Sequence, residues 1–110
     1  MIDHYEDFRA VHDLMPGSDF LLRVDGICVF TTTGFGARLE AIEGNTGINP
    51  QMLTLLLVID GPDPGTAVNE VLTPVPVHYE MKTETDYKQV SFRVRTDDEP
   101  PPTIDVEEVR

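Results

Sequence analysis

Two segments of the chain alternate between apolar and polar residues, and this alternation limits the possible folds more than any other feature of the sequence. A period of two places every second side chain on the same face of a β-strand. In 75–83 and 87–95 the apolar positions are Val75, Val77, Tyr79, Met81, Val90, Phe92 and Val94. The two segments are therefore predicted to be strands with one buried face each.

These two strands are predicted to pair as a hairpin. With Glu84-Thr85 as the turn, Val77 faces Phe92 and the apolar faces coincide, whereas a shift of one residue would separate them. Since proline has no N–H to donate to a ladder, Pro74 and Pro76 place the start of the first strand at a sheet edge.

Further strands are predicted between turn signals. Asp25-Gly26 separates two apolar runs in 20–31, and Asp-Gly is favoured in two-residue type I′ hairpin turns. Segment 52–59 is apolar on both faces, as in a strand covered on both sides, and 37–42 predicts a short strand. The Gly-, Pro- and Asn-rich segments 43–50 and 60–65 predict turns.

The N-terminal segment predicts one helix. Asp3 can cap it, Pro16-Gly17 would end it, and its apolar stripe comprises Tyr5, Phe8, Val11 or His12, and Met15. The expected fold is mainly β: an antiparallel sandwich or open barrel of five to seven strands with this helix packed on it. The alternative is a two-layer α+β fold. We expect one globular domain over 1–96 and a flexible, acidic, proline-rich tail over 97–110.

The charge of the chain limits its partners. Twenty acidic residues against eight Lys and Arg give a net charge of −12, which repels nucleic acids and anionic membranes. Cys28, the single cysteine, allows neither an internal disulfide nor a CxxC metal site. The acidic start of the chain does not resemble a signal peptide, and the longest apolar run is too short to cross a bilayer. We therefore expect a cytoplasmic protein.

The Gly34-Phe35-Gly36 stretch resembles a phosphate-binding loop only in part. A dinucleotide-binding fingerprint needs a third glycine where Leu39 stands, and a helix after it. We interpret these glycines as a bend at the exit of a strand, with Phe35 packed on the core or a partner, and Arg38 paired with an acidic residue.

Few residues are candidates for chemistry. His4, His12 and Asp13 are the candidate metal ligands, although the histidines lack the i, i+4 spacing that clamps one metal. His78 is expected opposite Ser91, and Cys28 is expected to be a buried thiol opposite Arg23. No catalytic residue and no cofactor is predicted.

The sequence favours a small, non-catalytic interaction or accessory protein. Its partner would be another protein or a second copy, bound through a sheet edge or face. One alternative is a metal-dependent enzyme or sensor of small molecules that uses His4, His12 and neighbouring acids. The other is an acidic decoy of a basic or nucleic-acid-binding partner.

Overall fold

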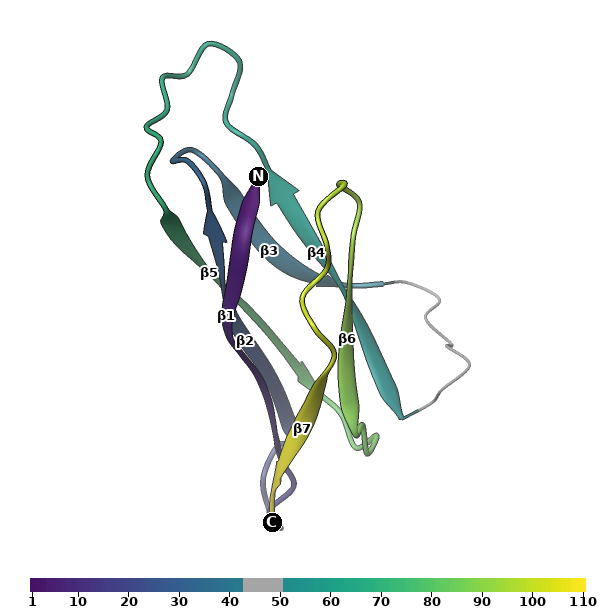
Figure 1. The fold of residues 1–110 in the computed structure, drawn as a ribbon. Helices are drawn as coiled ribbons and strands as arrows, with labels where there is room; N and C mark the ends of the chain where they lie inside the picture. The colour runs from purple at the N-terminus through teal and green to yellow at the C-terminus, as the bar shows by residue number, and fades with distance from the viewer. Residues whose placement is uncertain (43–50) are drawn as a thin grey trace.

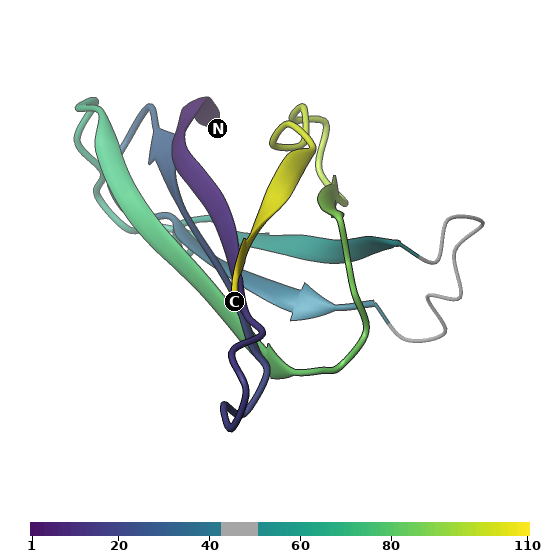
Figure 2. The ribbon, with the colours of Figure 1, turned by 90° about the horizontal axis from the view of Figure 1, so that it is seen from below.

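A computed structural model describes residues 1–42 and 51–110, and within these ranges the protein is all-β (Figure 1). The strands are β1 (Ile2–Asp13), β2 (Leu21–Phe30), β3 (Gly36–Ala41), β4 (Met52–Asp60), β5 (Thr73–Lys82), β6 (Gln89–Val94) and β7 (Ile104–Val109). They form one sheet in the order β3-β4-β6-β7-β1-β2-β5, which curls until it nearly closes into a barrel (Figure 2). The mainly-β prediction is confirmed. The sheet is mixed rather than antiparallel, because β1 pairs with β7 and β4 with β6 in parallel.

The predicted N-terminal helix is wrong, and the α+β alternative with it, because 2–13 form strand β1. Two β-bulges interrupt its ladder with β2, one between Ile2 and His4 and one between Glu6 and Arg9. A bulge inserts one extra residue, so that residues three apart point to the same face. Ile2, Tyr5 and Phe8 consequently all pack against the core. Their spacing is helical in the sequence although the segment is extended.

The predicted hairpin at Asp25-Gly26 is also wrong. β2 continues through both residues and pairs with β1 on one side and with β5 on the other. Gly26 serves a different purpose: a Cβ built there would lie 2.5 Å from two ring carbons of Phe8. Glycine inside a strand often marks such a close approach. Gly26 therefore makes room for the Phe8 ring.

The predicted pairing of the strands at 75–83 and 87–95 is wrong, whereas their buried faces are right. β5 pairs with β2, and β6 lies between β4 and β7. Val77, Val90 and Phe92 are all buried, as the alternation predicts. β5 is one of the two outermost strands of the sheet, so the edge position predicted from its prolines is confirmed.

The strand predictions for 52–59 and 37–42 are confirmed by β4 and β3. Leu55 and Leu57 of β4 are at most 1% exposed, and each fully buried leucine contributes about 1.5–3 kcal/mol. At the exit of β2, Phe35 stacks on Phe30 with ring centroids 4.7 Å apart, as the bend interpretation predicts. Asp60 still belongs to β4, whereas 61–65 contain no strand, and the turn predicted at 43–50 lies outside the described residues.

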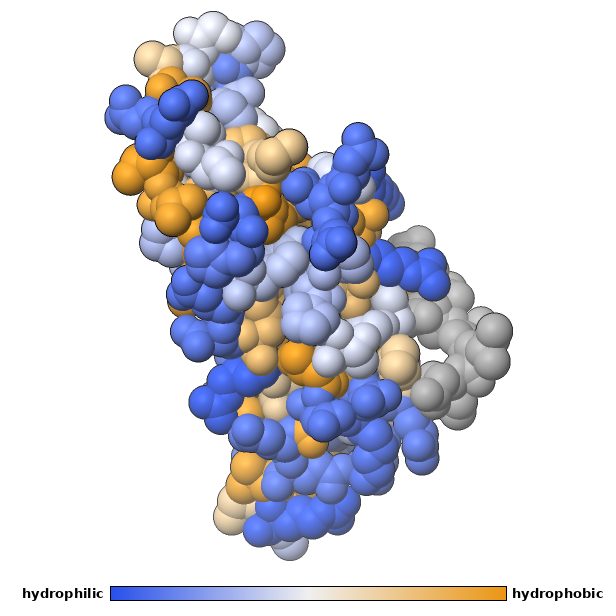
Figure 3. All heavy atoms as spheres, viewed as in Figure 1, coloured by the Kyte–Doolittle hydropathy of each residue, from blue (hydrophilic) through white to orange (hydrophobic). Residues whose placement is uncertain are grey.

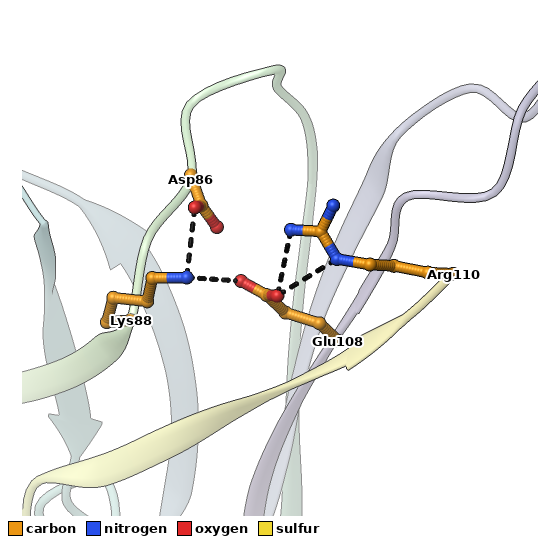
Figure 4. A network of polar contacts seen from close by, with 4 residues as sticks. All are labelled: Asp86, Lys88, Glu108 and Arg110. Atoms are coloured by element: carbon orange, nitrogen blue, oxygen red, sulfur yellow. Dashed lines mark hydrogen bonds and ion pairs between the residues drawn. The ribbon is translucent and has the colours of Figure 1, made fainter.

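Part of the segment predicted to be a tail belongs to the sheet. β7 pairs with β1 over Ala10–Asp13 and with β6 at Gln89 and Val90. Its far end is attached to the segment before β6 by ion pairs, in which Lys88 Nζ lies 2.9 Å from both Asp86 and Glu108 (Figure 4). Arg110 contacts the other oxygen of Glu108 at 3.0 Å. β7 therefore joins two groups of three strands, β3-β4-β6 and β1-β2-β5.

Candidate partner-binding cleft

The N-terminal part of β1 has a strand neighbour on one side only in the described part of the chain. β1 pairs with β2 from Ile2 to His12, but with β7 only over Ala10–Asp13. Both ribbon views show β1 and β7 diverging from their paired ends (Figures 1 and 2). Residues 2–9 thus form an open strand edge within a sheet that is otherwise nearly closed.

The segment 98–102 passes along this edge without adding a strand to it. Pro100, Pro101 and Pro102 have no N–H, so they cannot donate to a β-ladder. Two side-chain hydrogen bonds hold the segment there. The Ile2 N–H donates to Asp98 Oδ1 at 3.3 Å, and the Tyr5 hydroxyl donates to the Glu99 carbonyl at 2.5 Å. The prolines therefore run beside β1 and leave its edge without a neighbouring strand.

A cleft lies between β1 and this segment. Its main part has a volume of about 470 Å³ and is lined by Ile2, Asp3, His4, Tyr5, Asp98, Glu99 and Pro102. A second hollow of about 130 Å³ continues along the strand, lined by Tyr5, Glu6, Asp7, Phe8, Pro102 and Ile104. We call the two together the β1 cleft. Its main part is within the 300–1,000 Å³ that is usual for binding pockets.

The β1 cleft is acidic, and its one imidazole is bound to two carboxylates. His4 Nδ1 lies 2.6 Å from Asp3 Oδ2, and Nε2 lies 2.6 Å from Glu6 Oε2. The contact with Asp3 and then that with Glu6 raise the pKa of His4 above its ordinary value. Burial raises the pKa of Tyr5, so its hydroxyl stays a hydrogen-bond donor at neutral pH.

The structure does not bring the candidate metal ligands His4, His12 and Asp13 together. His4 is exposed in the β1 cleft, whereas His12 is fully buried. His12 Nε2 lies 2.9 Å from the Thr83 carbonyl oxygen and 3.2 Å from that of Phe20, so its N–H is shared between two backbone carbonyls. Asp13 instead accepts the Met15 N–H at 3.1 Å. Within the described ranges, no group of three or more His, Cys, Asp or Glu side chains could hold a metal ion.

His78 has acidic partners in place of the predicted serine. Its ring contacts Asp25 and Glu80. The hydrogen bond with Asp25 raises the pKa of His78 most, and the one with Glu80 raises it next. Ser91 instead shares a 2.8 Å hydrogen bond with Thr54. The predicted pairing of His78 with Ser91 fails because β5 and β6 are not neighbours.

Cys28 and Arg38 match their predicted surroundings more closely. Cys28 is buried, and burial raises its pKa to about 11, but its neighbours across the sheet are Tyr5 and Val75 rather than Arg23. Arg38 contacts Glu40 at 2.6 Å and Asp60 at 2.8 Å, as expected for a cation in an acidic chain.

A second exposed feature is apolar. Val71 and Leu72, in the loop between β4 and β5, are 53% and 56% exposed, and this region is orange in the space-filling view (Figure 3). Two hydrogen bonds attach the loop to the segment after β2: the Thr33 N–H donates to the Asn69 carbonyl at 3.0 Å, and the Asn69 N–H donates to the Thr33 hydroxyl at 2.9 Å. Apolar residues are therefore presented at a fixed place on the surface.

Sequence reasoning missed the β1 cleft because both of its walls were assigned to other structures. One wall is the bulged strand that resembles a helix, and the other is the segment 98–102 that resembles a tail. The signals that could have indicated it are the repeated three-residue spacing of Ile2, Tyr5 and Phe8, and the run of three prolines.

Comparisons with family models, with curated proteins and with solved structures find no match for this chain. Among the residues that the structure describes there is no helix able to span a membrane. The chemistry of the β1 cleft is therefore the basis for a functional proposal.

Proposed function

We propose that this protein is a non-catalytic interaction protein that binds an extended segment of a partner protein in the β1 cleft. The observation that supports this most is the open edge of β1 over residues 2–9. An unpaired edge offers main-chain donors and acceptors to an added strand, and this mode of recognition recurs in peptide-binding domains. The partner segment would extend the sheet on the side that β7 leaves free.

The cleft favours a different protein over a second copy as the partner. Two identical β1 edges would bring Asp3, Glu6 and Asp7 of each copy together, and like charges across a strand pair are destabilising. An added strand would also meet apolar side chains at the floor of the cleft, since Tyr5, Phe8 and Ile104 line it. Main-chain pairing would supply affinity, and these side chains would supply packing.

The proposal can be tested with short peptides as probes. In three eight-residue peptides Val and Thr alternate with Lys, Gln or Glu, and in a fourth the four central residues of the Lys peptide are replaced by Pro. We expect at least one of the three strand-forming peptides to shift the NMR amide signals of residues 2–9 and to leave those of β3 unchanged. The proline peptide should not do so, because its four consecutive prolines have no N–H to donate from either edge. Failure of all three to bind, or shifts confined to other surfaces, would refute the proposal.

Self-association through the exposed apolar loop is the second candidate, and it is favoured by the exposure of Val71 and Leu72. Light scattering across a concentration series tests it, with Leu72→Asp as the variant. A concentration-dependent dimer that Leu72→Asp abolishes would support it, and a monomer at all concentrations would exclude it.

A further inference from the structure

The outward side chains along the β1 cleft are almost all of one sign. Three carboxylates come from β1 and two from the segment across the cleft: Asp3, Glu6, Asp7, Asp98 and Glu99. The residues that line the cleft include no lysine or arginine. Arg9, the nearest cation along β1, is bound to Glu107 at 3.0 Å. An occupant of the cleft would thus meet five acidic groups and no fixed positive charge.

His4 occupies the position that a positive charge from a partner would take. Both of its ring nitrogens contact carboxylates, those of Asp3 and Glu6, at 2.6 Å. Asp98 and Glu99 line the same cleft from the opposite wall, whereas the neighbour of His4 on β2 is the uncharged Val29. Asp3 and Glu6 are the two carboxylates that favour a cation at this point. Since His4 is itself 42% exposed, an entering side chain can displace it.

We propose that the occupant of the β1 cleft is an extended basic segment of a partner protein, whose Lys or Arg side chains displace His4 from Asp3 and Glu6. This inference rests on the proposed function and adds the chemical class of the partner. Charge complementarity supports it, because opposite potentials on two surfaces increase specificity and the rate of encounter. The net charge of −12 acts in the same direction at long range.

The same peptides test the inference by their relative affinities. At 50 mM salt the Lys peptide should bind at least tenfold more tightly than the Gln peptide, and the Glu peptide should not bind measurably. Raising the salt to 0.5 M should remove most of this difference, because screening acts on exposed charges. The Asp3→Asn/Glu6→Gln double variant should lose most of its preference for the Lys peptide over the Gln peptide.

The chain offers a matched control. His78 also contacts two carboxylates, Asp25 and Glu80, and none of these three residues lines the β1 cleft. The Asp25→Asn/Glu80→Gln double variant changes the net charge by the same amount and should keep the affinity for the Lys peptide. Equal loss in both double variants would mean that only the overall charge matters, and would overturn the inference.

His4→Gln tests the displacement. Removing the competing imidazolium should strengthen binding of the Lys peptide several-fold at pH 6 and less at pH 8.5, where more of the His4 in the native protein is neutral. An unchanged pH profile in His4→Gln would refute the role of His4. Equal affinity for the Lys and Gln peptides would overturn the basic partner and leave the proposed function intact, whereas no binding of any peptide would refute the proposed function itself.

Discussion

Replacing Gly26 with alanine is expected to destabilise the protein through the Phe8 side chain rather than through the backbone. Gly26 lies within β2 and is not among the glycines with positive φ, so alanine can adopt its conformation. The new Cβ, however, would lie 2.5 Å from carbons of the Phe8 ring, and that ring also packs edge-to-face against Phe92. Overpacking of this kind costs about 1–3 kcal/mol. Replacing a glycine in a strand with alanine by itself raises the free energy of unfolding by about 0.5–1 kcal/mol.

The net loss should be about 1–2 kcal/mol, which for a domain of this size lowers the Tm by about 4–8 °C. Urea and thermal unfolding of the native protein, Gly26→Ala, Phe8→Ala and the double variant measure the coupling between the two positions. With the ring removed, Gly26→Ala should be neutral or stabilising by up to about 1 kcal/mol. If Gly26→Ala lost the same stability in the native protein and in Phe8→Ala, the reasoning would be refuted. Such a result would mean that the backbone at position 26 needs glycine, whatever side chain stands at position 8.

Three further predictions concern buried and paired side chains. His12→Ala should lower the free energy of unfolding by about 2–4 kcal/mol, because it leaves a cavity and deprives the Phe20 and Thr83 carbonyls of their donor. His12→Gln, which can still donate, should lose less, and an equal loss would contradict the hydrogen-bonding role. The Cys28 thiol, with a pKa of about 11, should resist thiol reagents at pH 8 until denaturant is added, so rapid labelling of the native protein would contradict its burial. NMR titration should give His78 a pKa above 6.5 that Asp25→Asn lowers more than Glu80→Gln does. Since the folded pKa exceeds the unfolded one, these contacts stabilise the fold below about pH 6.5, and the contribution is lost as the pH rises through the folded pKa. An unshifted pKa would mean that the contacts do not persist in solution.

The period-two segments show which part of the fold can be predicted from this sequence. Alternation depends only on which side of a strand is buried, so Val77, Val90 and Phe92 are correctly placed in the core. It contains no information about which strand lies next to which. The predicted pairing of Val77 with Phe92 joins neighbours in sequence, whereas in the structure β5 and β6 are separated by three other strands of the sheet. Long-range pairing is a property of the whole chain and is not encoded in either segment alone.

The N-terminal segment shows why the candidate site was missed. A spacing of three residues is one turn of helix, but it is also the spacing of inward residues around a bulge. Only the ladder with β2 distinguishes the two, and Phe8 reaches the core only because Gly26 makes room for it across the sheet. His4 is predicted as a candidate metal ligand together with His12 and Asp13, whereas in the structure its ring contacts Asp3 and Glu6, which the extended strand brings to it.

The position of β7 has a consequence for how this chain reaches its fold. The group β1-β2-β5 and the group β3-β4-β6 are interleaved along the sequence, so neither is a continuous piece of chain. β7 joins them, and it pairs with a strand that begins about a hundred residues earlier. A topology of such distant contacts folds slowly, because the entropy of closing long loops is lost before the contacts that repay it are formed. We therefore expect slow assembly in one cooperative step, in which an acidic strand of six residues completes the sheet.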